Sequence, residues 1–160
     1  MISTQLSTEE QATCYQIMQH IERLRNLLNR MAIQLLQRGE LHDQSKLKAP
    51  EIAAYTANFH LLKDFTFGSP EYEANKAKTG MNEALAHHYA QNRHHPEHFK
   101  HGLSDMDMID VLEMLCDWKA SSELQLNGNL RKSIEVNGRR FGMSSDLIRL
   151  FENTVPLLEG

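Results

Sequence analysis

The longest helical pattern in the chain runs from Ser7 to Gly39 and reads STEEQATCYQIMQHIERLRNLLNRMAIQLLQRG. Apolar side chains recur in it at steps of three and four residues, which places them on one face of an α-helix. Ser7 and Glu10 have the spacing of a capping box, and Gly39 suits the position just after a helix. The pattern therefore predicts a helix from Ser7 to about Gly39. Its apolar positions are Cys14, Ile17, Leu24, Leu27, Leu28, Met31 and Leu35.

The rest of the chain keeps this helical spacing, and no stretch alternates apolar and polar residues as a half-buried strand does. We expect a loop at 65–69, irregular backbone at 93–104 and a turn at 127–129, followed by a short helix or irregular segment. We expect further helices at 50–62, from 70 or 81 to 92, at 104–124, and from 144 or 145 to about 158. The fold prediction is an all-α, single-domain helical bundle of five or six helices over residues 1–160.

The composition is that of an ordinary globular protein. The chain has 160 residues, with 17 Lys and Arg against 21 Asp and Glu, so the formal net charge is −4. No apolar run is long enough for a transmembrane helix, and the first residues lack the basic and apolar regions of a secretory signal. Cys14 and Cys116 cannot form a disulfide framework and are expected to be small buried side chains in a reducing compartment. We therefore expect a cytoplasmic protein without membrane contact, and a mildly acidic chain is a poor general binder of nucleic acid.

The chain is unusually rich in histidine, with nine residues. His42 and Asp43 form an adjacent pair that offers an imidazole nitrogen and two carboxylate oxygens at one point. A carboxylate can bridge two cations, which an imidazole cannot readily do. Lys46 follows Asp43 by three residues, about one helical turn, and can reach the same face.

Three further places hold residue types that ligate metals. His20 lies on the apolar face of the first helix, where an imidazole needs a partner for each ring nitrogen. Five histidines fall between residues 87 and 98, and spacing alone leaves open His87 or His88, and His94 or His95. Asp117 lies within an apolar helical segment, where a carboxylate must be paired or bound to a cation. Glu113 is the other candidate for that buried acid.

In this order the residues resemble the HD-domain superfamily of metal-dependent phosphohydrolases, named for its His-Asp doublet. The segment Leu41-His42-Asp43-Gln44-Ser45-Lys46 is similar to the family pattern Leu-His-Asp-Ile-Gly-Lys, with Ser45 where the family has Gly. His20 resembles the first family histidine, and Met114 to Asp117 resemble its late helix with a final Asp. The chain also resembles small phage and bacterial relatives that carry a segment like His88 to Glu97.

The resemblance implies a metal centre. It implies that one divalent cation is held by His20, His42, Asp43 and Asp117. A second would be held by His88 and by His94 or His95, with Asp43 bridging. Mixed imidazole and carboxylate ligands suit manganese, iron, cobalt, nickel or zinc better than calcium, and magnesium prefers an oxygen-only shell.

The implied activity is hydrolysis of a nucleotide or other small phosphate ester by a metal-activated water. Asp43 and Lys46 would be the catalytic residues, and Lys46 or Arg93 would stabilise charge on the phosphoryl oxygens. One alternative is an HD-fold di-iron oxygenase, which a shell of four histidines and two aspartates resembles. A second alternative is a helical binding module without catalysis. The apolar C-terminal segment from Leu147 to Leu158 suits either core packing or contact with a second copy of the chain.

Overall fold

The computed structural model describes residues 6–59, 74, 79–124 and 128–159, and these contain six α-helices and no strand. The all-α prediction is confirmed. Three short 3₁₀ helices, η1, η3 and η4, join the α-helices. The elements in chain order are α1 Thr8–Leu41, η1 Gln44–Leu47, α2 Glu51–Phe59, α4 Met81–Gln91, η3 Pro96–His98, η4 Gly102–Asp105, α5 Met108–Glu123, α6 Leu130–Arg140 and α7 Ser145–Leu158.

The chain divides into two compact units, residues 1–40 and 41–160. The prediction of one domain over the whole chain stays a prediction. The first unit is made almost entirely of α1, which begins where the capping box predicts. The Ser7 backbone N–H donates to Glu10 Oε2 (2.7 Å), and the Glu10 N–H donates to Ser7 Oγ (3.2 Å).

The predicted end of this helix at Gly39 is wrong by two residues, because the helix continues to Leu41. The residue with left-handed backbone is Asp43, with φ 56°. Asp is one of the few residues other than Gly that visit this region. The chain therefore turns at the His42-Asp43 pair itself, and the glycine is accommodated within the helix.

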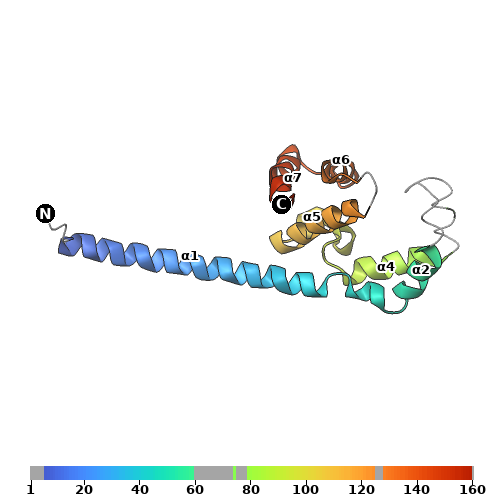
Figure 1. The fold of residues 1–160 in the computed structure, drawn as a ribbon, viewed down its shortest axis with the longest axis horizontal. Coiled ribbons are helices and arrows are strands. Elements are labelled where there is room, and N and C mark those ends of the chain that lie inside the picture. The colour runs from blue at the N-terminus through green and yellow to red at the C-terminus, as the bar shows by residue number, and fades with distance from the viewer. Residues whose placement is uncertain (1–5, 60–73, 75–78, 125–127, 160) are drawn as a thin grey trace. The chain divides into compact units, whose positions relative to one another are not determined.

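The second unit has two separate hydrophobic clusters. The smaller one joins α2 and α4 through Ala54, Met81 and Ala84. The larger one joins α5, α6 and α7, with Trp118 of α5 edge-to-face against Phe151 of α7 at 6.0 Å between ring centroids. Figure 1 shows α2 beside α4, and α5 to α7 gathered together. The buried residues of the larger cluster are Met114, Leu115, Leu130, Ile134, Phe151 and Val155.

Helix caps explain several boundaries in this unit. Ser144 Oγ accepts from the Leu147 N–H (3.2 Å), which confirms the predicted start of the last helix. Asp107 caps α5 by accepting from the N–H groups of Ile109 and Asp110, so this helix begins at Met108 rather than at 104. The predicted loop at 65–69 and residues 60–62 of the predicted second helix lie outside the described residues.

Both cysteines are exposed, so the prediction that they are buried is wrong. On α5 the core side chains are Met114 and Leu115, and the next residue, Cys116, points off the packed face. In α7, Phe151 and Val155 are buried, whereas Leu150 and Leu157 are exposed. No helix among the described residues has the length and apolar character needed to span a bilayer.

Candidate metal centre

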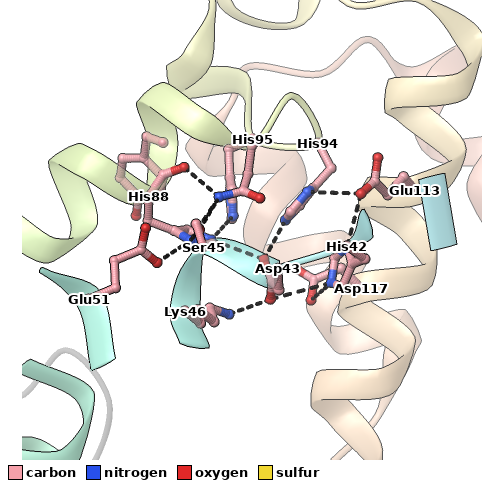
Figure 2. A network of polar contacts seen from close by, with 12 residues as sticks. His42, Asp43, Ser45, Lys46, Glu51, His88, His94, His95, Glu113 and Asp117 are labelled. Atoms are coloured by element: carbon pink, nitrogen blue, oxygen red, sulfur yellow. Dashed lines mark hydrogen bonds and ion pairs between the residues drawn. The ribbon is translucent and has the colours of Figure 1, made fainter. Parts of the chain in front are cut away.

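The His42-Asp43 pair lies in the turn between α1 and η1, at the start of the second unit. Lys46 of η1 donates to Asp43 Oδ2 at 2.5 Å, and its Nζ also lies 5.6 Å from the centre of the Tyr55 ring. The ammonium group therefore neutralises one carboxylate oxygen of Asp43. The other oxygen, Oδ1, is directed at a group of histidines (Figure 2).

These histidines come from the end of α4 and the segment that follows it. Asp43 Oδ1 lies 3.3 Å from His88 Nε2 and 3.6 Å from His94 Nε2. His88 Nε2 lies 2.9 Å from His95 Nε2. Helix α4 ends at Gln91, before His94 and His95. His95 has extended backbone, which the following Pro96 favours.

On its other side Asp43 faces His42 and α5. His42 Nε2 lies 3.4 Å from Asp43 Oδ2 and 3.6 Å from Asp117 Oδ1. Residues far apart in the sequence thus present ligand atoms to one place. We name the two sets that meet there group A, made of Asp43, His88, His94 and His95, and group B, made of His42, Asp43, His94 and Asp117. Within each group the ligand atoms lie within 4.8 Å of one another.

A divalent cation fits the polar atoms of these groups. Asp43 Oδ1 and His94 Nε2 are both buried and have no hydrogen-bond partner. Leaving a buried polar atom unsatisfied costs about 1–3 kcal/mol. A cation shared by these two atoms would satisfy both, and imidazole with carboxylate is a usual ligand set for transition metals.

Glu113 of α5 orients two of the histidines. Its Oε1 accepts a hydrogen bond from His42 Nδ1 at 2.9 Å and lies 3.2 Å from His94 Nδ1. Because the carboxylate oxygen can only accept, a proton on Nδ1 suits both rings, and both Nε2 atoms face the ligand groups. A carboxylate behind a histidine in this way fixes the ring and increases its basicity as a ligand.

Glu51, the first residue of α2, does the same for His88. It is fully buried, with Oε2 2.8 Å from His88 Nδ1 and Oε1 2.7 Å from His87 Nδ1. The geometry favours His88 over His87 as the ligand, and the choice stays a prediction. His88 presents Nε2 to group A, and His87 is a partner of Glu51 outside both groups. Both His94 and His95 belong to group A.

A model of a family of unknown function, DUF5662, matches residues 9–159. The chain belongs to this family. The DUF5662 match spans both units and every residue of groups A and B. No curated protein and no solved structure matches the chain.

The surroundings of the groups shift the pKa values of their histidines in opposite directions. Hydrogen bonds to Asp117, Asp43 and Glu113 raise the pKa of His42 to about 11, so His42 would release its Nε2 proton on binding a cation. Burial, with the neighbouring His94 and His88, lowers the pKa of His95 to about 3. Burial also lowers the pKa of His88, so His88 and His95 are held in the neutral form that ligates a metal.

The pKa of Asp43 is lowered even though burial by itself would raise it. Hydrogen bonds from His42 and Lys46 outweigh the burial and keep this carboxyl ionised. Burial also opposes ionisation of Asp117, and the hydrogen bond with His42 lowers its pKa nonetheless. Asp43 and Asp117, the two carboxylates of the groups, are therefore charged at neutral pH.

The structure brings together six of the seven residues that the sequence predicts as ligands. The seventh, His20, is exposed on α1 in the first unit and belongs to neither group, so its role stays a prediction. Arg93, predicted to contact phosphate, donates through Nε and Nη2 to Asp110 at 3.1 and 2.8 Å. The six residues are His42, Asp43, His88, His94, His95 and Asp117.

Of the two carboxylates that contact the histidines from behind, Glu113 is a candidate from the sequence and Glu51 is not. The sequence offers Glu113 as an alternative to Asp117. In the structure both face the site, because residues four apart on α5 share a face: Asp117 belongs to group B, and Glu113 contacts His42. Glu51 was not singled out. Its position directly after Pro50 marks only the first turn of a helix, and nothing in the local sequence indicates that its side chain is fully buried.

Proposed function

We propose that this chain is a metal-dependent phosphohydrolase of the HD type, acting on a nucleotide or other small phosphate ester. The proposal rests above all on the two oxygens of Asp43. Oδ1 faces the Nε2 atoms of His88 and His94, and Oδ2 faces His42 Nε2 at 3.4 Å. One carboxylate between two sets of imidazoles is the arrangement that a bridging ligand requires.

The ligand set supports a transition metal. The groups offer four imidazoles and two carboxylates, which suits manganese, iron, cobalt, nickel or zinc, in one or two ions. When bound, such an ion lowers the pKa of water from its bulk value to about 7 and so supplies a nucleophile at neutral pH. The histidine rings contribute by being fixed in position by Glu51 and Glu113.

Lys46 is the protein cation best placed to assist. Its Nζ lies against Asp43 Oδ2 and its side chain is about one-third exposed (36%), so it can reach a phosphoryl oxygen beside the groups. Developing negative charge on that oxygen would be stabilised by the ammonium group. Arg93 is committed to Asp110, which makes it a support for the segment that carries His94 and His95.

The test is metal analysis followed by a phosphate-release screen over nucleotides and simple phosphate esters with added manganese, cobalt or nickel. We expect metal-dependent release that Asp43→Asn reduces by more than a hundredfold. Glu123→Gln, an exposed carboxylate of α5 paired with Lys119, is the control and should stay within twofold of the parent protein. Release within tenfold of the parent in Asp43→Asn would remove the hydrolase proposal.

A second candidate is supported by the number of histidines. His94 and His95 both join group A, so the two groups together contain four histidines and two aspartates, the shell expected of a di-iron oxygenase. Iron that co-purifies with the protein and dioxygen uptake with an organic substrate would favour this reaction. Phosphate release without dioxygen would favour hydrolysis. Substoichiometric metal and no reaction of either kind would favour a binding module.

A further inference from the structure

A cavity of about 680 Å³ lies in the second unit between the residues of the metal groups and α6. His95 of group A and Asp117 of group B both line it. A ligand in this cavity therefore touches residues of both groups. The volume is in the range of pockets that take small organic molecules, about 300–1,000 Å³.

Helix α6 forms the wall on the other side of the cavity. Its buried face is made of Leu130, Ile134 and Gly138, which are four residues apart, and Leu130 and Ile134 belong to the larger cluster. The residues two places further on, Lys132 and Arg140, line the cavity. They are eight residues apart, so they lie on one side of the helix and about 12 Å apart along its axis.

The charge of this wall is positive. Lys132 forms no ion pair with any residue in the described part of the chain. Arg140 is paired with Glu97 at 2.5 Å but keeps half of its side chain exposed, and its guanidinium lies 4.8 Å from the centre of the Phe141 ring. Among the described residues that line the cavity, Asp117 of group B is the one carboxylate.

Neutral hydrogen-bonding groups complete the lining. Asn129, which caps α6, Asn137 of α6 and Ser121 of α5 line the same cavity, and Trp118 adds an aromatic surface. A polar, positively charged wall opposite a set of metal ligands suits a molecule with negative charge at both of its ends. A substrate with a single anionic group at the metal groups would leave Lys132 and Arg140 of α6 without an anion to bind.

We infer that the substrate of the proposed hydrolase carries a second anionic group, such as a carboxylate or another phosphate, which Lys132 and Arg140 bind while the reacting phosphate lies at the metal groups. The inference rests on the proposed function. It makes Lys132 and Arg140 specificity-determining residues. Each charge-assisted hydrogen bond contributes about a tenfold gain in affinity.

The experiment uses the zinc-loaded protein and phosphonates, which are not hydrolysed. Phosphonocarboxylates of two to six carbons are each compared with the alkylphosphonate of the same length. Calorimetry gives the affinity. Emission from Trp118, the only tryptophan in the sequence, shows whether the ligand enters this cavity. We expect at least one phosphonocarboxylate to bind about tenfold or more tightly than its matched alkylphosphonate and to change the emission.

Variants test the assignment to α6. Lys132→Ala and Arg140→Ala should each reduce this preference by about tenfold while zinc content stays unchanged. Arg139→Ala is the control, because Arg139 is exposed, is paired with Glu135 and does not line the cavity. It should keep the preference. Equal binding of both ligand series, a preference that survives both alanine variants, or tight binding without any change in Trp118 emission would overturn the inference.

The outcome separates this inference from the function it rests on. A protein that binds no zinc contradicts the metal centre and hence the proposed function. A protein that binds zinc and hydrolyses phosphate esters, yet shows no preference for the second anion, contradicts the α6 site alone. Binding of the doubly anionic ligand without hydrolysis of any phosphate ester supports the α6 site and contradicts the hydrolase.

Discussion

His42 Nδ1 lies 2.9 Å from Glu113 Oε1, across 71 positions of the sequence. The same oxygen lies 3.2 Å from His94 Nδ1, so one carboxylate of α5 contacts two rings that reach it from different segments. Both rings belong to group B, and His94 belongs also to group A. The geometry of the candidate centre therefore depends on a residue that is not itself among the ligands.

Glu113→Gln should weaken metal binding by about 10- to 100-fold, the usual effect of losing a carboxylate behind a ligating histidine. The amide is nearly the same size, but it carries no charge and can present an N–H to one of the rings. Competition against a chromogenic chelator measures the affinity. Glu123→Gln on the same helix is the matched control. Unchanged affinity in Glu113→Gln would show that the rings are held without this carboxylate.

Glu51→Gln should act on group A and spare group B. Glu51 contacts His88 and His87, and neither of these belongs to group B. If two ions bind, this variant should retain one tightly bound equivalent and lose the second at limiting metal, whereas Glu113→Gln should weaken both. Metal equivalents determined after gel filtration provide the measurement. The same loss in both variants would argue for a single ion held by the two groups together.

The sequence predicted most of the helices because their ends carry local signals. Ser7 with Glu10, and Ser144, have the spacing of caps, and the structure contains the corresponding hydrogen bonds. The predicted helix end at Gly39 is wrong because glycine permits a left-handed turn without requiring one. The left-handed turn is at Asp43 instead, whose side chain belongs to both groups.

The candidate ligands were predictable by residue type, but their partners were not. His42 and Asp43 stood out as an adjacent pair, and Asp117 as a carboxylate in an apolar helical segment, whereas spacing left His87 or His88 and His94 or His95 open. Glu51 is one of many acidic residues in the chain, and its role depends on complete burial against His88, a tertiary property. The exposure of Cys116 was also not predictable: it lies in an apolar helical segment of the sequence, yet its side chain is exposed.

The capping box of α1 should respond to acid. The pKa of Glu10 is lowered because the Ser7 backbone N–H, and then the Ser7 hydroxyl, donate to its carboxylate. The first turn is therefore stabilised above the ordinary pKa of a glutamate, and this contribution is lost as the pH falls through the lowered value. The amide shifts of Ser7 and Glu10 in a nuclear magnetic resonance titration report it. In Ser7→Ala the Glu10 transition should move upward, and an unchanged midpoint would contradict the role of the hydroxyl.

Metal should stabilise the second unit, because the ligands link its two hydrophobic clusters. His88 belongs to α4 beside the smaller cluster, and Asp117 belongs to α5 in the larger one. At a metal concentration about 100 times Kd, mass action adds about 2.7 kcal/mol to the free energy of unfolding. Each kcal/mol raises Tm by about 2–8 °C in a domain of this size. Thermal unfolding with zinc and with chelator measures the shift. Asp43→Asn should show none, and an equal Tm for the parent protein in both conditions would argue against a bound ion.

Replacements of Asp43 should separate its backbone role from its chemistry. The residue has φ 56°, a conformation that Asn shares readily and that costs Ala roughly 1–2 kcal/mol. In chelator, Asp43→Ala should therefore be less stable than Asp43→Asn by about 1 kcal/mol in urea unfolding, and Asp43→Gly should not carry this steric penalty. All three variants should lose metal binding, because each removes the carboxylate that groups A and B share. If Asp43→Ala were as stable as Asp43→Asn but equally unable to bind metal, the carboxylate would matter and the left-handed turn would not be a constraint on this position.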